Sequence, residues 1–468
     1  ELSITASHLD PADKVEAHDD GRITYPGWDL GRQAAPVAIT ETATITYSMA
    51  PDSTYEVVRA QIDRATQSLY YEGHVLTHVD LAEAIVARLN ANPGMTVTLL
   101  LDGAPSGGIT DQQKWICQQI ESAGGQVYYM AAIDGVRPRY GAIYGRTLIV
   151  DERVLLTGAG DMDYLTMPAD DKRDGTVGRR GMWLVTDAPT AVAHALDVFH
   201  QDVDQTHYRD LVRWTAEHPD YGAPPPGFEP TRDSGGTLYN APYTLPLTIQ
   251  GTLGMELIQT PENSLDSGGG LLGLVARVSA GDRMWVVQSH EPPHWGPADS
   301  KPEIDPNPRL EAYLDAARRG GQIKLLLDRS PPDGTSPSAN KATCAYVNGM
   351  AAAQQLDIAC RLATPMGEGI GANAVLAWVG GKGYVHLGSI DGAEATAKDS
   401  RALAVQVQSD QAYYYLAWKV GTDWNNATYS VYMPYIIRLR PVPGNLPGEY
   451  AYALQAHGEH KLPEIVES

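Results

Sequence analysis

Hydrophobic residues follow two alternating spacings along the first half of the chain. Residues 97–101 form a largely apolar run that ends in Asp-Gly, which is the pattern of a buried parallel strand. Val58, Ile62 and Ala65 share one stripe of a segment at 55–68, as in an amphipathic helix. The other predicted elements are a strand at 69–72, helices at 81–90 and 110–123, and a hairpin of strands at 147–151 and 154–157. This alternation predicts an α/β layered domain.

Landmarks of the first half return in the second half in the same order. Residues 44–51 match 254–261, and both segments end in proline. Residues 97–105 match 323–331, and both contain Leu-Leu-Leu-Asp. A pair of degenerate motifs follows, and then Arg180 lies 22 residues before Asp202 as Arg401 lies 22 residues before Asp423. Landmarks in a shared order predict an internal duplication.

The duplication sets the predicted domain boundaries. We expect an N-terminal arm at 1–37, a first repeat at 38–215, a linker at 216–248, a second repeat at 249–440 and a C-terminal arm at 441–468. Pro224 to Gly227 give the linker its irregular character. Tyr450, Tyr452 and Leu454 alternate in the C-terminal arm, which predicts a strand that covers a sheet edge of its own chain or extends a neighbour's sheet.

Each repeat carries a two-part motif. In the first repeat, residues 144–151 are followed by Gly158-Ala159-Gly160-Asp161, and in the second, residues 372–379 are followed by Gly388-Ser389-Ile390-Asp391. This frame resembles that of the phospholipase D superfamily, whose members carry His-x-Lys-x4-Asp and then Gly-Ser-x-Asn, twice per active site. The resemblance implies an α/β fold of two tandem α/β/α units related by a pseudo-twofold, with the two motifs meeting at their junction.

The catalytic residues of that family are missing from both motifs. In the first, Tyr144 stands at the His position, Arg146 at Lys, Asp151 at Asp, Ala159 at Ser and Asp161 at Asn. In the family, one His attacks phosphorus and the other protonates the leaving oxygen, roles that suit a side chain with a pKa near neutrality. A Tyr nucleophile would need its pKa lowered by several units. We therefore expect no catalytic residue here.

The second motif leaves two frames open. If it begins at 372, the three positions are Ala372, Ala374 and Val379; if it begins at 374, they are Ala374, Leu376 and Gly381. Ser389 is retained and Asp391 replaces Asn. The Ala-Asn-Ala run has two explanations, an engineered knock-out and evolutionary drift, and the substitutions in the first repeat favour drift.

Some charged residues remain candidates for binding. Arg146 could hold an anion in the vestigial cleft, and His386 lies on a predicted strand two residues before Gly388. The pairs at 74/78 and 290/294 have the i, i+4 spacing of zinc ligands but no third ligand, so we expect no metal and no cofactor. The ligand-binding candidates are Arg146, Arg180, Arg401 and His386.

Charge and cysteine content restrict the partners and the compartment. A net charge of −22 without a Lys/Arg-rich run repels nucleic acid, and no apolar run is long enough to span a bilayer. Cys344 and Cys360 lie sixteen residues apart, and we favour buried free thiols over a disulfide formed in an oxidising compartment. The chain begins at Glu1 rather than Met, so we expect a processed or trimmed product.

Together these observations predict a catalytically inactive phospholipase D-like protein, extracellular or on the cell surface. Its expected role is structural, self-assembling through the terminal arms, or binding. Two alternatives remain: a phosphodiesterase or phospholipase D-type hydrolase that uses Tyr144 or His386 in a rebuilt site, and a module that binds a small anionic ligand in the vestigial cleft.

Overall fold

The computed structural model describes residues 35–133, 138–233, 235–329 and 338–427, together with four short strands nearer the termini, β1 (Glu16–Ala17), β2 (Ile23–Thr24), β20 (Arg438–Val442) and β21 (Ala451–Gln455). The chain forms two compact units. We call residues 1–427 the body and residues 428–468 the terminal unit. The first predicted repeat, the predicted linker and residues 249–427 of the second predicted repeat lie in the body.

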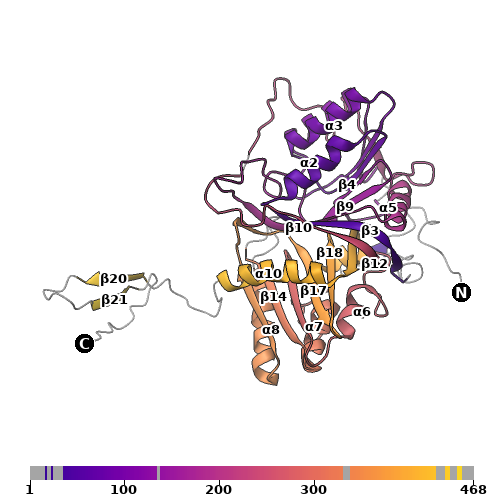
Figure 1. Ribbon diagram of the computed structural model, residues 1–468. Coiled ribbons are helices and arrows are strands. Elements are labelled where there is room, and N and C mark those ends of the chain that lie inside the picture. The colour runs from indigo at the N-terminus through magenta and orange to yellow at the C-terminus, as the bar shows by residue number, and fades with distance from the viewer. Residues whose placement is uncertain are drawn as a thin grey trace, which may run out of the picture. The chain divides into compact units, whose positions relative to one another are not determined.

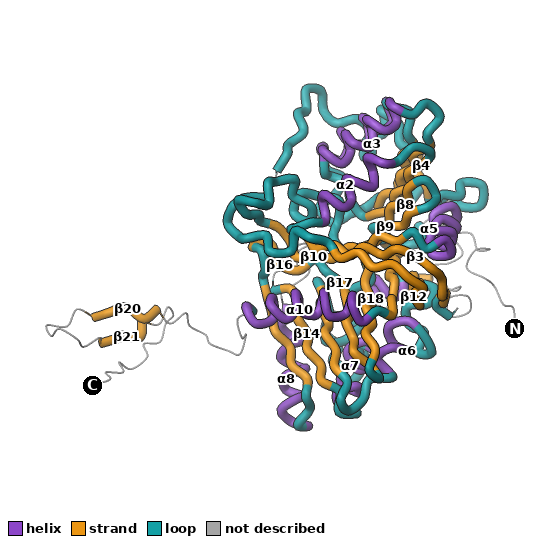
Figure 2. The backbone as a smooth tube through the Cα atoms, viewed as in Figure 1, coloured by secondary structure: helices purple, strands orange, loops and turns teal. Residues whose placement is uncertain are grey.

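One continuous mixed sheet runs through the body (Figures 1 and 2). From the centre outwards, its first half consists of β3 (Val37–Ala50), β10 (Gly178–Thr186), β9 (Val154–Gly158), β8 (Thr147–Val150), β4 (Ser68–Gly73), β5 (Thr96–Asp102), β6 (Gln126–Met130) and β11 (Leu211–Arg213). Its second half consists of β12 (Leu247–Thr260), β19 (Ser400–Gln408), β18 (Lys382–Gly388), β17 (Asn373–Val379), β13 (Arg283–Gln288), β14 (Gln322–Asp328) and β15 (Ile358–Ala363). Strands β4, β5 and β6 are mutually parallel, as are β13, β14 and β15.

The two halves join through the antiparallel pair β3 and β12, each 14 residues long. Thr42 pairs with Thr252 near the middle of this ladder, and their hydroxyl oxygens are 3.2 Å apart. Each strand ends at a cis peptide bond, before Pro51 in β3 and before Pro261 in β12. Thr42 and Thr252, which are matching positions of the two repeats, therefore face each other at the centre of the sheet.

Helices cover both faces of this sheet. The apolar residues of α2 (Thr54–Arg64), α3 (Val79–Ala91) and α4 (Asp111–Ser122) pack on one face of the first half, and those of α6 (Gly270–Ala276), α7 (Pro308–Arg318) and α8 (Ser338–Gln354) pack on the second half. The opposite face is shared by α5 (Pro189–Asp202) and α10 (Asp410–Asn426), whose apolar residues join a single core drawn from both halves. The short helix α9 (Glu394–Lys398) precedes β19.

The elements predicted for the first half are confirmed, with one shifted boundary. The predicted helix at 55–68 ends at Arg64, because Ser68 already belongs to β4. Helix α4 begins where Thr110 accepts a hydrogen bond from the backbone N–H of Gln113, a standard N-cap. The mixed α/β class is likewise confirmed.

The strand predicted at the end of the chain exists as β21 and pairs antiparallel with β20. Its partner thus comes from the terminal unit itself. β20 begins at Arg438, and the terminal unit that contains both strands begins at Thr428.

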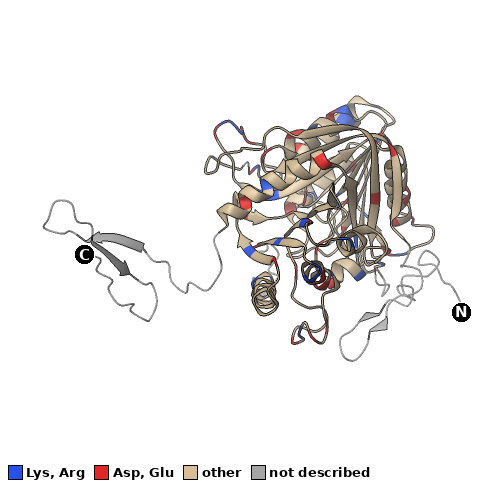
Figure 3. Ribbon diagram, turned by 60° about the horizontal axis from the view of Figure 1, so that its bottom comes forward, with Lys and Arg blue, Asp and Glu red and all other residues tan. Residues whose placement is uncertain are grey.

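Acidic and basic residues are interspersed over the ribbon of the body, as Figure 3 shows. In the described part of the chain, no helix combines the length and the apolar character needed to cross a membrane.

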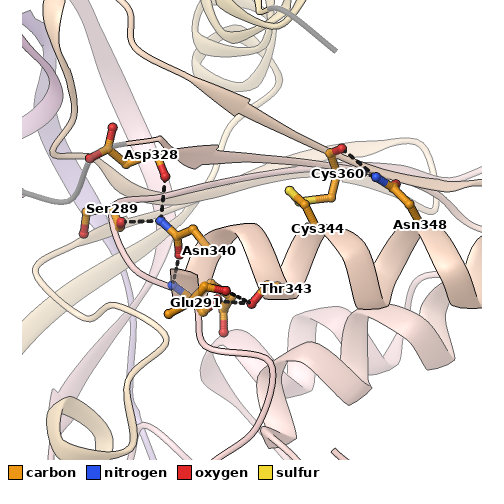
Figure 4. The surroundings of a disulfide bond; sticks show 9 residues. Ser289, Glu291, Asp328, Asn340, Thr343, Cys344, Asn348 and Cys360 are labelled. Carbon is orange, nitrogen blue, oxygen red and sulfur yellow. Dashed lines mark hydrogen bonds between the residues drawn. A yellow bond between two sulfur atoms is a disulfide. The ribbon is translucent and has the colours of Figure 1, made fainter. Parts of the chain in front are cut away.

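A disulfide joins Cys344 of α8 to Cys360 of β15 (Figure 4). The expectation of free thiols at these positions was wrong, because α8 packs directly against the outermost strand of the second half and brings the two Cα atoms within 4.9 Å. Cys117 is buried and free.

We expect reduction of this disulfide, or the double substitution C344S/C360S, to lower the free energy of unfolding by about 3 kcal/mol, the scale for closing a loop of this length in the unfolded chain. Chemical denaturation of the oxidised protein and the variant measures the difference. Cys117→Ser is the matched control, since it removes a thiol without removing a crosslink. An equal midpoint in oxidised and reduced protein would contradict the expectation.

Candidate functional site

Two short strands carry the motif segments across the junction. β7 (Ala142–Ile143) pairs in parallel with β19 of the second half, and β16 (Gly367–Ile370) pairs in parallel with β10 of the first half. Asp102 accepts a hydrogen bond of 2.7 Å from the N–H of Ile143, and Asp328 accepts one of 2.9 Å from the N–H of Ile370. The Leu-Leu-Leu-Asp landmarks thus end in carboxylates that fix the start of each motif.

Backbone pairing also fixes the frame of the second motif. The N–H of Tyr144 bonds to the carbonyl of Arg401 at 2.7 Å, and the N–H of Gly371 bonds to the carbonyl of Arg180 at 2.9 Å. Gly371 therefore occupies the place that corresponds to Tyr144. This frame begins one residue before the first of the two predicted frames. The sequence did not indicate it, because the residues around it have small side chains.

With that frame, Asn373 corresponds to Arg146. Its carbonyl oxygen accepts a hydrogen bond from the hydroxyl of Ser289 at 2.8 Å, so the amide is held inside the second half. Ala372 and Ala374 are fully buried in the shared core. The second motif thus presents no side chain able to act as a nucleophile or an acid at the three signature positions of this frame.

The two motifs are in contact at the junction. The hydroxyl of Ser389 lies 3.2 Å from the carbonyl oxygen of Gly145, which follows Tyr144. Tyr144 packs on the small apolar cluster that contains Ile390, the residue next to Ser389. Ser389 is itself buried and also accepts a hydrogen bond from the N–H of Leu403 at 3.0 Å. The retained serine therefore connects the halves.

The first motif contains an internal ion pair. Arg146 Nε lies 2.8 Å from Asp161 Oδ1, and both side chains are about one-seventh exposed, 15% and 14%. His74 Nδ1 lies 3.6 Å from the other carboxylate oxygen of Asp161, and its ring centroid is 4.9 Å from that of Tyr144. The positions that hold phosphate oxygens in the resembled family are here occupied by opposite charges that neutralise each other.

This ion pair shifts the pKa values of both side chains. Burial alone would raise the pKa of Asp161, but the charge of Arg146 and the adjacent imidazole of His74 lower that pKa well below its usual value. Burial opposes the charged form of Arg146 as well, yet Asp161 raises the pKa of the guanidinium. Arg146 has a left-handed backbone φ of 44°, an unfavourable conformation for a non-glycine residue.

Asp151 has a structural task. Its carboxylate accepts hydrogen bonds from the backbone N–H groups of Thr66, Gln67 and Ser68 at 2.7–3.0 Å, so it ties the β8–β9 turn to the start of β4. Burial would raise the pKa of Asp151, but these three donors keep it below the usual range.

His386 is fully buried on β18. Burial, with a smaller contribution from the charge of Arg309, lowers its pKa to about 3, so the ring is neutral at ordinary pH. Its Nδ1 has no hydrogen-bond partner in the described part of the structure. The histidine thus belongs to the interior of the second half.

Arg180 and Arg401 cross the junction in opposite directions. Arg180 of the first half bonds to Asp423 on α10 at 2.9 Å, and Arg401 of the second half bonds to Asp202 on α5 at 2.6 Å. The aspartate that lies 22 residues after each arginine in the sequence is therefore the partner of the other arginine. The pairs cross between the halves because α5 and α10 pack on the common face of the sheet.

Each arginine is further tied to the end of a central strand. Arg180 donates to the carbonyl of Ala50 and to Asp52, both at 2.9 Å. Arg401 donates to the carbonyl of Thr260 at 2.8 Å and to Glu262 at 2.7 Å. With side-chain exposures of 3% and 4%, neither guanidinium is available to a ligand in this arrangement.

A small cavity lies beside the first motif. Its volume is about 10 Å³, room for one water molecule, and its lining includes Glu72, Thr147, Gln259 and Arg401. Glu72 is buried and its Oε1 has no hydrogen-bond partner in the described structure. Burial, and secondarily the charge of Asp202, raises the pKa of Glu72 to about 8 against the opposing effect of Arg401.

A larger open hollow of about 630 Å³ lies elsewhere. It is lined by β3, α5 and the β8–β9 turn, with Thr42, Thr44, Arg153 and Asp187 among its residues. None of the motif positions described above lines it, so volume alone does not identify the site.

Sequence reasoning overlooked several residues of the junction. Glu72 lies in the strand predicted at 69–72, but its burial follows from the opposite half, which no local pattern reveals. His78 was considered as a metal ligand; its Nε2 lies 2.7 Å from the carbonyl of Met167 and its Nδ1 accepts from the N–H of Leu81, so it caps α3. The described residues contain no group of three or more His, Cys, Asp or Glu side chains arranged for a metal ion.

Comparison with known proteins identifies solved structures of similar fold. The structure resembles phosphatidylserine synthase of Haemophilus influenzae Rd KW20 with a TM-score of 0.52 and 10% sequence identity, over 81% of this chain and 85% of that one. Lower TM-scores are found for polyphosphate kinase of Porphyromonas gingivalis (0.45, 12% identity, 80% of this chain and 49% of that one) and for the phospholipase D family member Nuc of Salmonella typhimurium (0.27, 16% identity, 34% and 93%). No family model matches the sequence, and no curated protein matches it. The likeness to the phosphatidylserine synthase shows a similar α/β fold and concerns the fold alone.

We expect Arg401→Gln to destabilise the body by about 3–5 kcal/mol, because it leaves the buried carboxylate of Asp202 and the partly buried carboxylate of Glu262 without their cation. Urea unfolding measures the loss. The matched control is Arg173→Gln, which breaks the exposed pair with Asp171 and should leave the urea midpoint nearly unchanged. Equal effects of the two substitutions would show that the junction does not depend on this ion pair.

We expect Glu72 to make stability fall as pH rises. Its pKa is raised to about 8 in the folded protein, so from the ordinary carboxyl value near 4.5 up to about 8 the folded state retains a proton that the unfolded state has released. Glu72→Gln removes this difference, and the variant should gain stability relative to the parent between pH 5 and 8, by up to a few kcal/mol. Melting temperatures of both proteins across this range test it, and parallel pH profiles would contradict it.

Proposed function

We propose that this chain is a non-hydrolytic phospholipase D-like protein with a structural, self-assembling role. The observation that carries the proposal is the Arg146–Asp161 ion pair, which closes the phosphate position of the first motif, opposite a second motif reduced to Gly371 and Asn373. Displacing a mutually neutralised, largely buried pair to admit a phosphodiester would cost several kcal/mol.

In this proposal the body consists of two duplicated α/β/α units related by a pseudo-twofold through the β3–β12 ladder. Support comes from the equal lengths of these strands, the facing Thr42 and Thr252, and the common order of the strands in the two halves. The exchanged pairs of Arg180 and Arg401 fit the same relation. Duplication places the two degenerate motifs at the junction.

We further propose that the protein works outside the cell or at its surface. A disulfide between Cys344 and Cys360 persists in oxidising surroundings and is reduced in most cytosols. The crosslink fastens α8 to the outermost strand of the second half, which suits a durable structural component.

A second candidate function is a phosphodiesterase with a rebuilt site. It is favoured by one observation, the convergence of His74 and Arg146 on the ring of Tyr144, at 4.9 Å from the imidazole and 5.3 Å from the guanidinium. A histidine beside a tyrosine could serve as its general base. The cavity of about 10 Å³ beside the motif argues against it, because a phosphodiester needs far more room. Anion binding by the cleft lacks such support, since Arg146, Arg180 and Arg401 are each paired internally.

We expect bis(p-nitrophenyl) phosphate to be hydrolysed no faster than in buffer alone. The residues at the His positions of the two motifs do not provide the general acid and the nucleophile that the reaction needs. The assay compares the parent with Tyr144→Phe, His74→Ala and His386→Ala. Measurable turnover that disappears in Tyr144→Phe or His74→Ala would establish the rebuilt enzyme in place of our proposal. Turnover that survives all three substitutions indicates a contaminating hydrolase and leaves the expectation for this chain intact.

A further inference from the structure

The open hollow beside α5 has the size of a ligand site. We call it the α5 hollow; β3, the β8–β9 turn and the first half of α5 surround it, and Figure 1 shows α5 beside β3 and β9. Its volume of about 630 Å³ lies within the range of about 300–1,000 Å³ that is usual for small-molecule sites. The side chains that line it include Thr44, Glu152, Arg153, Asp187, Ala193 and Gln250.

Glu152, which lines the α5 hollow, has a strained backbone. Its φ is 53° and that of Asp151 is 52°, a left-handed conformation that is unfavourable for any residue except glycine. The hairpin of the second motif, β17 and β18, makes its turn with Gly380 and Gly381, whose φ values are 57° and 79°. The hydrogen bonds of Asp151 to the start of β4 explain one of the two strained residues. Strain at Glu152, which a glycine would remove, points to a function of its side chain.

A small residue on α5 keeps the hollow open. Ala193 lies nine residues before Asp202, as Tyr414 lies nine residues before Asp423. These two aspartates receive the exchanged arginines from α5 and α10, so the two positions correspond. The ring of Tyr414 packs 5.0 Å from that of Trp378. An aromatic ring at position 193 would occupy the α5 hollow, and alanine leaves it empty of side chains.

The polar groups of the hollow are held in fixed positions. Asp187 Oδ1 accepts a hydrogen bond of 2.6 Å from the N–H of Thr44, and Glu152 Oε1 accepts one of 3.2 Å from the hydroxyl of Tyr70. The second oxygen of each carboxylate has no hydrogen bond within the described structure. Strand pairing sets Gln250 directly opposite Thr44. The hollow thus presents acceptors and donors whose orientation is established before a ligand arrives.

These groups match a ligand that carries many hydroxyls. The carboxylates of Glu152 and Asp187 repel an anion, and covering them with a purely apolar molecule would remove them from water without compensation. A hydroxyl group donates to a carboxylate and accepts from a guanidinium such as that of Arg153, so it satisfies both kinds of group. An apolar wall suits the C–H face of a sugar ring, and the hollow has one, formed by Pro189, Ala193 and Leu196.

We propose that the α5 hollow binds a neutral carbohydrate, a short oligosaccharide or the end of a longer glycan. Hydroxyl groups of the sugar take the place of water on Glu152, Asp187 and Arg153, and one face of a ring lies against the apolar wall. This inference goes beyond the structural role proposed above. The hollow shares no residue with the motif positions, so its ligand and the loss of hydrolysis are independent questions.

Saturation-transfer NMR with maltose, cellobiose, lactose and diacetylchitobiose tests the proposal on the full chain. We expect at least one of these neutral disaccharides to bind at millimolar concentration, and Ala193→Tyr to weaken that binding at least about tenfold by filling the hollow. The matched control is Gln201→Tyr, which adds the same ring to an exposed position of α5 outside the hollow. Melting temperatures show that both variants are folded. Absence of binding for all four sugars, or an equal loss in both variants, overturns the proposal.

Glu152→Gly separates binding from folding. The substitution relieves the left-handed strain and removes a carboxylate from the hollow, so we expect the melting temperature to rise while the affinity for the sugar falls about fivefold or more. A glutamate retained for the fold alone would give a lower melting temperature and an unchanged affinity. That result would overturn the proposal.

Charged sugars test the chemical class of the ligand. Glucose, glucosamine and glucuronate are compared by the same NMR measurement. We expect glucose to bind at least as well as the other two, because Arg153 opposes the ammonium group and the two carboxylates oppose the uronate. Stronger binding of either charged sugar overturns the choice of a neutral ligand.

Discussion

The exchanged ion pairs of Arg180 and Arg401 are the constraint on which the rest of the body depends. Two buried guanidiniums are costly to remove from water, and each is compensated only when a carboxylate of the opposite half and a carbonyl at the end of a central strand are both in place. A half that moved relative to the other would leave these charges unpaired. The ladder of β3 and β12, the positions of α5 and α10, and the contact between the motifs are therefore fixed together.

The proposed loss of catalytic side chains is compatible with this constraint, because the contacts between the halves and the proposed catalytic positions depend on different atoms. The halves are joined through backbone groups of the motifs, such as the N–H of Tyr144 and of Gly371, and through the hydroxyl of Ser389. Side chains at the His and Lys positions can change without disturbing those bonds. The Arg146–Asp161 pair is an example. When no phosphate is bound, the cation at this partly buried position is stabilised by a carboxylate of its own chain.

The sequence predicted the elements and the order of the landmarks well, since both follow from local periodicity and spacing. The strand ending at Asp102 and the helix beginning after Thr110 depend on neighbouring residues alone. The frame of the second motif could not be predicted, because Gly371 is recognised only by its bond to the carbonyl of Arg180 in the other half. The burial of Glu72 and the exchange of the arginine partners depend on the same long-range packing. The 22-residue spacing drew attention to the arginines and aspartates that form the ion pairs. It did not indicate which arginine pairs with which aspartate.

The two ends of the sheet are closed by different means, and this difference bears on assembly. In the first half, β11 pairs with β6 and covers its edge. In the second half, no described strand lies outside β15; instead the side chain of Asn348 bonds to both the N–H and the carbonyl of Cys360, at 2.9 and 3.1 Å, beside the disulfide (Figure 4). An amide that occupies the middle of an open edge prevents another strand from pairing there. The edge of the sheet is thus protected against indiscriminate association with other strands.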